Sequence, residues 1–174
     1  MDTIKAIKER RSIRNYKKEH VSQEVIDKII DAGLYAASGM NQQSAIIVQV
    51  SDKEIRDKLS KMNAKVMGMD KDPFYGAPDL LIVLANKDMP TYIYDGSLVM
   101  GNLMIAAHEL GVGSCWIHRA KEMFETEGGK EILSLIGIQG NYEGIGICII
   151  GYVDGAYPEA KPRKENRVYK INWK

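Results

Sequence analysis

The stretch DLLIVLAN, residues 79–86, is a continuous apolar run of the length expected for a buried β-strand. A second run of this kind, GIGICIIGYV, occupies residues 144–153. AIIVQV (45–50) and GSCWIH (113–118) predict two further strands. These four segments predict one central sheet.

Helical patterns occupy the segments between the strands. They are predicted at residues 3–10, 20–38, 94–110 and 120–136, and a further helix opens at SDKEIRDKL, residues 51–59. The first helix carries Ile4 and Ile7 on one face, and a capping box of Ser51 and Glu54 starts the helix at 51–59. The 94–110 helix is apolar nearly all round and is expected to be buried on most sides, and the last helix has a weak point at residues 128–129. The predicted order begins with helices and continues with strands and helices mixed. This order predicts an α+β fold with helices layered around the sheet.

The composition excludes several classes of protein. The chain has 174 residues, 45% of them hydrophobic, which predicts one globular domain over residues 1–174, with a C-terminal extension from about residue 155. The 24 Lys and Arg against 23 Asp and Glu leave a net charge of +1, without the basic excess of a nucleic-acid-binding protein. The apolar segment 98–117 is interrupted by Asn102, His108 and Glu109, so we expect no membrane-spanning helix.

The cysteines predict neither a disulfide framework nor a metal site. The chain has two, Cys115 and Cys148, and Cys148 lies in an apolar strand, where a free cysteine usually acts as a small hydrophobic residue. Cys115 and His118 have a C-x-x-H spacing, but no second pair of ligands accompanies them. Because the segment MDTIKAIKERR also lacks the apolar core of a signal peptide, we expect a cytoplasmic protein.

A dense group of cations follows the first helix, in KERRSIRNYKK at residues 8–18. Arg10, Arg11, Ser12 and Arg14 place three guanidinium groups and a hydroxyl within five residues, a set that can bind a phosphate through charge-assisted hydrogen bonds. Alternatively, Arg10 and Arg11 complement the C-terminal dipole of the first helix. This segment alone leaves both interpretations open.

No cluster of side chains typical of acid–base or nucleophilic catalysis stands out. GIGICIIG, residues 144–151, lacks the third glycine of a dinucleotide-binding loop and lies inside a predicted strand rather than at a strand-to-helix turn. An enzyme without such side chains often leaves the chemistry to a cofactor.

The end of the chain combines high charge with a regular apolar pattern. Tyr169, Ile171 and Trp173 alternate with polar residues at the period of a strand that buries one face. We therefore expect this tail to add to a sheet edge, either its own or a partner's.

Five segments in series resemble the FMN-dependent nitroreductase family, in particular its short, single-domain members. They are RRSIRNY (10–16), ASGMNQQSAIIVQV (37–50), GAPDLLIVLA (76–85), GNLMIAAHELGVGSCWI (101–117), and a strand ending in GY followed by PEAKPRK (158–164). The resemblance covers essentially the whole chain. It implies an α+β fold with a central mixed, largely antiparallel sheet flanked by helices, and a homodimer whose C-terminal tail crosses to the partner subunit. It also implies two FMN molecules at the subunit interface.

The resemblance also implies which residues bind the cofactor. Arg10, Arg11 and Ser12 would contact the FMN phosphate and ribityl chain. Arg14 would lie beside the pyrimidine edge of the flavin, where a positive charge favours the anionic reduced form.

Further contacts are implied on three other segments. Ser38, Met40, Asn41 and Gln43 would reach the flavin held mainly by the other subunit, Trp116, Ile117 and His118 would lie against the ring, and Lys161 and Arg163 would close over the phosphate. Alternatively, Asn41 and Gln43 satisfy loop backbone groups, and Lys161 and Arg163 are solvated tail charges. Two family prolines are replaced by Ala37 and Ser44, which predicts a more mobile loop, and His118 replaces a glycine or an acidic residue.

The activity implied is that of an NAD(P)H oxidoreductase, in which NADH or NADPH reduces FMN and a nitroaromatic, quinone or similar acceptor then takes the hydride in a ping-pong cycle. Alternatives are a dehalogenating or flavin-degrading relative, a flavin-binding protein without turnover, and a nucleic-acid-binding module, which the net charge disfavours. Met62, Met67 and Met69 either fill gaps in the core or line a substrate entrance.

Overall fold

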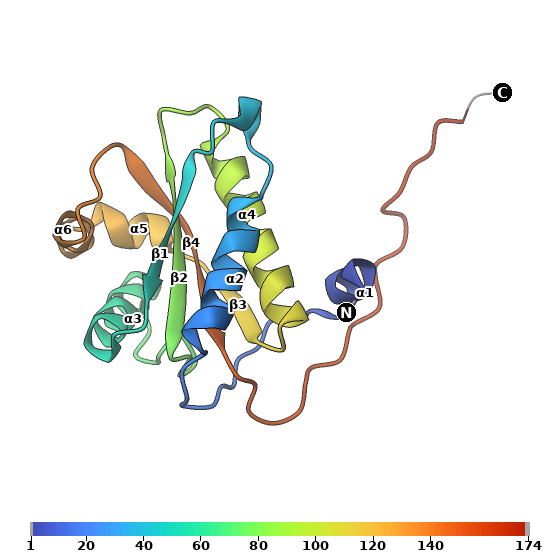
Figure 1. Cartoon of the computed structure of the whole chain (residues 1–174), viewed down its shortest axis with the longest axis horizontal. Coiled ribbons are helices and arrows are strands. Elements are labelled where there is room, and N and C mark those ends of the chain that lie inside the picture. The colour runs from blue at the N-terminus through green and yellow to red at the C-terminus, as the bar shows by residue number, and fades with distance from the viewer. Residues whose placement is uncertain (1, 173–174) are drawn as a thin grey trace.

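Four strands form one antiparallel sheet in the computed structural model, which describes residues 2–172 (Figure 1). They are β1 (Ala45–Val50), β2 (Asp79–Asn86), β3 (Gly113–Ile117) and β4 (Tyr142–Gly151), in the order β1-β2-β4-β3. All strands predicted from the sequence are present, each within two residues of its expected ends. Parallel pairing occurs only at an isolated bridge between Ser12 and Ser114, within the part of the chain described.

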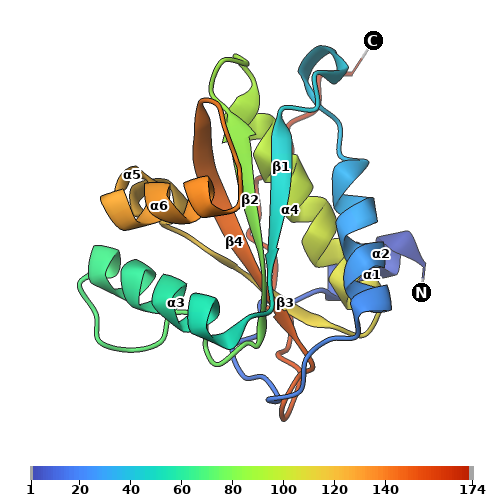
Figure 2. The ribbon, with the colours of Figure 1, turned by 60° about the vertical axis from the view of Figure 1, so that its left-hand side comes forward.

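Helices cover both faces of this sheet (Figures 1 and 2). The helices are α1 (Thr3–Glu9), α2 (Gln23–Leu34), α3 (Lys53–Met67), α4 (Tyr92–Glu109), α5 (Ala120–Glu125) and α6 (Glu127–Leu135), with a short 3-10 turn η1 at Gly39–Asn41. Helices α2 and α4 lie on one face, and α3, α5 and α6 on the other. Along β2, Leu80 and Ile82 belong to one core, and Leu81 and Val83 to the other, which explains why this strand is apolar throughout. The predicted α+β fold is confirmed.

Helix α2 begins three residues later and ends four residues earlier than the predicted 20–38 helix, and two further details of the helices differ from the sequence-based prediction. The N-cap of α3 is Asp52, whose carboxylate accepts a hydrogen bond from the Ile55 N–H, so the capping box predicted at Ser51 is wrong by one residue. The predicted 120–136 helix is two helices, which separate at Thr126; its hydroxyl caps α6 by accepting from the Gly129 N–H. Aspartate and threonine are both strong N-cap residues, so each begins a helix where it stands.

Helix α4 is less buried than its apolar sequence suggests. Ile93, Tyr94 and Leu98 are exposed along one side, whereas Met100 and Leu103 on the other side are fully buried. Ile4 and Ile7, the expected apolar face of α1, are also half exposed. The described chain therefore has apolar helix faces that its own core does not cover.

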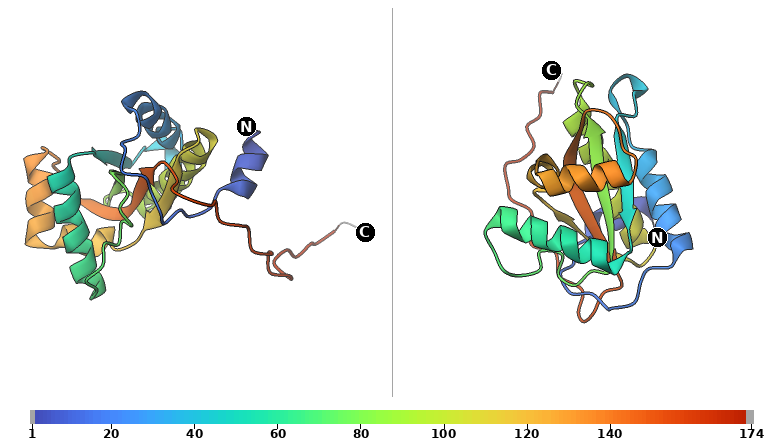
Figure 3. Two further views of the ribbon diagram at one scale, coloured as in Figure 1. Left: turned by 90° about the horizontal axis from the view of Figure 1, so that it is seen from below. Right: turned by 90° about the vertical axis from the view of Figure 1, so that its left-hand side faces the viewer.

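The C-terminal segment from residue 155 runs away from the sheet on the side where α1 lies (Figures 1 and 3). Residues 155–172 contain no strand, and Tyr169 and Ile171 are fully or nearly fully exposed. Trp173, the third member of the predicted stripe, lies outside the described residues. Pairing of this tail with its own sheet is not observed, and pairing with a partner stays a prediction.

Candidate functional site

The arginine-rich segment lies directly beside β3. Ser12 forms the parallel bridge with Ser114, and the Ile13 N–H donates to the Ser114 carbonyl at 3.0 Å. Ile13 and Tyr16 are buried in the core, and the Tyr16 hydroxyl donates to the Ile13 carbonyl at 2.8 Å. These two buried anchors fix the backbone of the segment, while Arg14 between them is exposed.

The arginines at the start of this segment carry unused hydrogen-bond donors. Nη1 of Arg10 and Nε of Arg11 are buried and have no hydrogen-bond partner among the described residues. Nη1 of Arg11 donates to the carbonyls of Lys8 and Arg10, at 2.8 and 2.5 Å. Arg11 thus partly satisfies the C-terminal end of α1, as the helix-dipole interpretation requires, yet donors on both arginines remain available for an anion.

A cavity of about 260 Å³ lies next to this segment. Arg14 and residues 115–118 line one part of it, and Met67, Met69, Lys71 and Tyr75 line the other. The structure therefore brings Arg14, Trp116, Ile117 and His118 together, four of the residues that the family resemblance selected from separate parts of the chain. Trp116 and His118 also line a neighbouring cavity of about 300 Å³, together with the buried Glu143.

The loop before β2 supplies a cavity wall that sequence reasoning did not identify. The Arg14 guanidinium lies 5.8 Å from the centre of the Tyr75 ring, a cation–π distance, and Tyr75 has a left-handed backbone with φ 54°. Asp72 accepts hydrogen bonds from the Arg56 guanidinium, the Ser60 hydroxyl and the backbone of residues 74 and 76. Burial opposes ionisation of Asp72, but these hydrogen bonds hold its pKa below the usual value. The loop is therefore held by a charged carboxylate.

Asn63 of α3 fixes the other end of the cavity. It is fully buried, and its side-chain amide donates to the His118 carbonyl at 2.9 Å. Arg119 follows in a left-handed conformation with φ 76°, which costs a non-glycine residue about 1–2 kcal/mol. The chain therefore leaves β3 through a strained turn, and strain of this kind is common at functional sites.

Two glycines of β4 allow close packing beneath the site. A Cβ atom on Gly146 would lie 2.5 Å from Nε1 of Trp116, and one on Gly144 would lie 2.4 Å from the backbone of Ala120. The glycines that failed as a dinucleotide-binding motif thus have a packing reason: they let the Trp116 ring and the start of α5 approach the strand.

The 38–44 loop is held by one buried carboxylate, Asp95 of α4. Its Oδ1 accepts from the Gly39 N–H at 3.0 Å, and its Oδ2 accepts from the hydroxyls of Ser44 at 2.7 Å and Thr91 at 3.0 Å. Burial opposes ionisation of Asp95, but these three donors hold its pKa below the ordinary value. Ser44, which replaces a family proline, therefore ties the end of the loop to α4.

Within this loop, the side chains expected to reach a flavin point outward. Met40, Asn41 and Gln43 are exposed and have positive φ angles of 50°, 55° and 48°. The Gln43 N–H donates to the Ser38 hydroxyl at 3.0 Å, and the Gln43 amide donates to Asn41 at 3.3 Å. The internal bonds agree with the loop-satisfying interpretation, although the side chains remain accessible.

The described chain does not bring all predicted residues together. The 38–44 loop precedes Ala45, which pairs with Ala85 at the end of the sheet where β4 begins. Ser12 and Ser114 lie at the opposite end of the sheet, because Ser114 pairs with Ile150 and Ile150 pairs with Asp79. Lys161 and Arg163 are exposed in the tail, where Arg163 donates to the Lys161 carbonyl.

The remaining candidates are placed as follows. Met67 and Met69 line the cavity, whereas Met62 packs against the core, so the two interpretations of the methionines apply to different members. Cys148 is fully buried, and burial raises its pKa to about 12. Among residues 2–172, no group of three or more His, Cys, Asp or Glu side chains could hold a metal ion, and no helix is long and apolar enough to cross a membrane.

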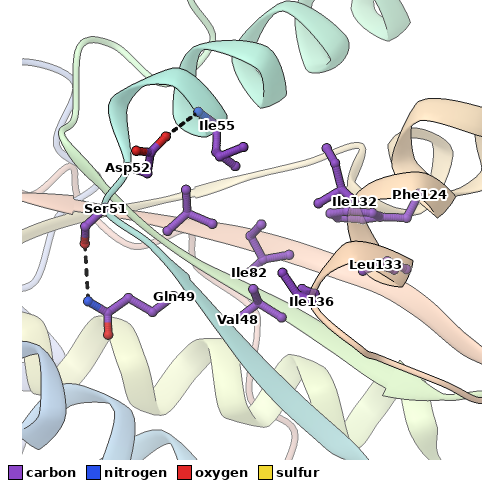
Figure 4. Close-up of a pocket in the computed structure, with 11 residues that line it drawn as sticks. Val48, Gln49, Ser51, Asp52, Ile55, Ile82, Phe124, Ile132, Leu133 and Ile136 are labelled. Carbon is purple, nitrogen blue, oxygen red and sulfur yellow. Dashed lines mark hydrogen bonds between the residues drawn. The ribbon is translucent and has the colours of Figure 1, made fainter.

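A separate apolar cavity of about 210 Å³ opens between β1, α3 and α6 (Figure 4). Val48, Ile55, Ile82 and Ile132 point into it, and Ser51 and Asp52 lie at its rim, whereas the Gln49 amide is bonded to Gln23 of α2 on the other face of the sheet. It contains none of the residues that the sequence predicted for the site.

Comparison with known proteins identifies the family to which the chain is similar. The family model described as the nitroreductase family matches residues 7–69 and 65–152. A protein of Methanothermobacter thermautotrophicus, provisionally named NADH dehydrogenase/NAD(P)H nitroreductase, is 33% identical over 139 residues, which are 78% of this chain and 70% of that protein.

Two solved structures are also similar. A nitroreductase with bound FMN from Bacteroides fragilis superposes with a TM-score of 0.91 at 24% identity, over 99% of this chain and 100% of that one. An FMN-dependent nitroreductase from Clostridium difficile R20291 has a TM-score of 0.78 at 30% identity, over 98% of this chain and 99% of that one. With the family model matching most of the sequence and the fold agreeing throughout, the chain belongs to the nitroreductase family.

Proposed function

We propose that this protein is an FMN-dependent NAD(P)H oxidoreductase that reduces nitroaromatic, quinone or similar acceptors by ping-pong hydride transfer. The observation that carries the proposal is the pairing of Ser12 with Ser114. It joins a segment with free arginine donors to a strand whose end, together with Arg14, lines a cavity. Hydrogen-bond donors for a phosphate, next to a cavity that Arg14 and residues 115–118 line, suit a phosphorylated flavin.

Different residues of this chain would bind different parts of the cofactor. Arg10, Arg11 and Ser12 would hold the phosphate and the ribityl chain, since Nη1 of Arg10 and Nε of Arg11 are buried donors without partners in the described part of the chain. Arg14 would place its charge at the pyrimidine edge, and residues 116–118 would line the ring. When bound, FMN supplies the hydride chemistry. The protein supplies position and charge.

We propose a homodimer because one chain makes an incomplete site. The 260 Å³ cavity is smaller than the roughly 300–1,000 Å³ of typical ligand sites. The exposed Met40, Asn41 and Gln43, with Ser38, would complete it from the partner, and Lys161 and Arg163 would close over the phosphate. The uncovered apolar faces of α1 and α4 are of the kind that protein interfaces bury.

The tail would contribute to the same interface. Tyr169 and Ile171 are exposed on a segment that leaves its own sheet, and β1 is a sheet edge with no strand on its outer side among residues 2–172. We propose that the tail crosses to the partner and pairs there. Residues 1–174 would then form one FMN-binding domain with an extension from about residue 155, and the free, buried thiols suit a protein of the cytoplasm.

The decisive experiment is optical. We expect the purified protein reconstituted with FMN to be yellow, to bleach with NADH or NADPH in the absence of oxygen, and to regain colour with a nitroaromatic or a quinone. Colour without bleaching would favour a flavin-binding protein without turnover. Loss of flavin or release of halide during turnover would favour the degrading or dehalogenating alternatives. A colourless protein that retards nucleic acid would contradict the proposal.

A further inference from the structure

A tyrosine at the start of the tail contacts the arginine-rich segment through its backbone. The Tyr157 hydroxyl accepts a hydrogen bond from the Arg11 N–H at 2.9 Å, across 146 positions of sequence. The same hydroxyl lies 2.9 Å from Nδ1 of His108, near the end of α4. The rings of His108 and Tyr157 are also in contact, with centroids 5.5 Å apart and an interplanar angle of 36°. Three separate elements therefore meet at one hydroxyl group.

The direction of these hydrogen bonds follows from the donors available. The Arg11 N–H can only donate, so the Tyr157 oxygen accepts from it and uses its own hydrogen toward Nδ1 of His108. Burial lowers the pKa of His108, which favours the neutral ring, the form in which Nδ1 can accept this hydrogen bond. The two hydrogen bonds are cooperative, because donation of the Tyr157 hydrogen to the histidine makes the tyrosine oxygen a better acceptor for the Arg11 N–H.

The position of these hydrogen bonds matters more than their strength. Arg11 lies between Arg10 and Ser12, and downstream of Ser12 the backbone is fixed by Ile13 and Ser114. Upstream, helix α1 is only half buried and ends at Glu9. Ala6 of α1 is buried and α1 packs against α4, and at Arg11 itself the Tyr157 hydroxyl holds the backbone on the α1 side of Ser12.

We propose that Tyr157 and His108 are positioning residues for the phosphate end of the cofactor site, and that together they hold the Arg10–Ser12 backbone in the geometry that binds phosphate. The inference rests on the proposed function, in which this segment binds the FMN phosphate. It assigns to the first part of the tail a role within its own chain, separate from the crossing proposed for the part of the tail that carries Tyr169 and Ile171.

The test compares FMN with riboflavin, which has the same ring and ribityl chain but no phosphate. Affinities would be measured by flavin fluorescence titration of the full chain. For Tyr157→Phe we expect the Kd for FMN to rise about three- to tenfold, the effect of one hydrogen bond, while the Kd for riboflavin stays within about twofold. Tyr142→Phe is the matched control, because Tyr142 is a part-buried tyrosine at the start of β4, at the opposite end of the sheet from Ser114.

Variants of His108 separate positioning from general stability. His108→Asn keeps an acceptor near the place of Nδ1 and should retain most of the FMN affinity, whereas His108→Leu should lose as much as Tyr157→Phe. Because both residues act through one chain of hydrogen bonds, the Tyr157→Phe/His108→Leu double variant should bind FMN no more weakly than the weaker single variant.

Each outcome decides a different question. Parallel loss of FMN and riboflavin affinity, or additive effects of the two substitutions, would overturn the positioning role. An unchanged FMN affinity in Tyr157→Phe, in a protein that prefers FMN to riboflavin, would overturn it as well and leave the proposed function intact. If the unsubstituted protein binds both flavins equally, the phosphate site itself is wrong, and the inference falls with it.

Discussion

The Arg14 guanidinium lies over the ring of Tyr75, 5.8 Å from its centre, and both side chains line the cavity that residues 115–118 also line. Two segments far apart in the sequence thus fix one positive charge beside the candidate site. A cation held by an aromatic face keeps its position without being neutralised by a carboxylate. Arg14 is therefore suited to act on charge that develops on a bound ligand.

The first prediction concerns this charge. We expect Arg14→Gln to lower the midpoint potential of bound FMN, because a nearby cation stabilises the anionic reduced form more than the neutral oxidised form. Arg14→Lys keeps the charge, so its bound FMN should have a midpoint potential close to that of the parent protein. Spectroelectrochemical titration of both variants is the measurement. Equal potentials in Arg14→Gln and the parent would show that Arg14 does not stabilise the reduced flavin.

Arg10 should act on affinity rather than on potential. Its Nη1 is a buried donor without a partner in the described residues, and a hydrogen bond to a charged group is worth about 1.5–3 kcal/mol. We expect Arg10→Ala to weaken FMN binding roughly ten- to a hundredfold with little change in the unfolding of the apoprotein. Lys5→Ala, an exposed cation on α1, is the control. Retention of FMN through dilution as in the parent would show that Arg10 does not bind the phosphate.

The third prediction concerns the stability of the 38–44 loop against acid. The pKa of Asp95 is lowered in the folded protein, so its contribution is fully present above the unfolded value of about 3.9 and is lost as the pH falls through the folded value. We expect Asp95→Asn to cost about 1–3 kcal/mol at neutral pH and to reduce the loss of stability below about pH 4.

Urea unfolding between about pH 3 and 7 would measure this dependence, with the exposed Asp31→Asn as control. A variant that loses stability at neutral pH but keeps the full acid-dependent loss would show that other carboxylates, such as Asp72, dominate the acid response.

Removal of the end of the tail tests the proposed crossing. Tyr169 and Ile171 are exposed in the described chain, and each would contribute about 1.5–3 kcal/mol if fully buried in a partner, as an upper figure. Truncation after Asn166 should therefore loosen the dimer and reduce FMN retention, which sedimentation and flavin content would detect. A tight truncated dimer with its full FMN content would make the tail an accessory. Tyr157 is retained in this truncation, so the two roles assigned to the C-terminal segment are tested separately.

The sequence was most informative where a local pattern determines local structure. Residues 79–86 predicted β2 correctly because a strand covered on both faces must be apolar throughout. The cap of α3 was misplaced because Ser51 and Asp52 are adjacent and both suit the position; the choice depends on which backbone N–H each can reach.

The site was predictable only in part, for a similar reason. Arg14 and Trp116 were identified through a family pattern, but nothing near Tyr75 or Asn63 in the sequence indicates that Tyr75 lines the cavity or that Asn63 holds the His118 carbonyl. Their role arises when α3 and the loop before β2 pack beside the end of β3. Likewise, Tyr157 occurs in a charged tail, and its link to Arg11 exists only after the fold has formed.

The strand order has a consequence for the order in which the protein can fold during synthesis. β4 is the last strand to be made, yet it lies between β2 and β3 and pairs with both. Until residues 142–151 have emerged from the ribosome, β2 can pair only with β1, and β3 has no strand to join. The apolar strand at 79–86 therefore keeps one edge unpaired until β4 has been made, and nascent chains in this state aggregate or recruit chaperones. Ribosome-bound chains that end before β4 should accordingly be digested by protease, and chains that expose all of β4 should resist it.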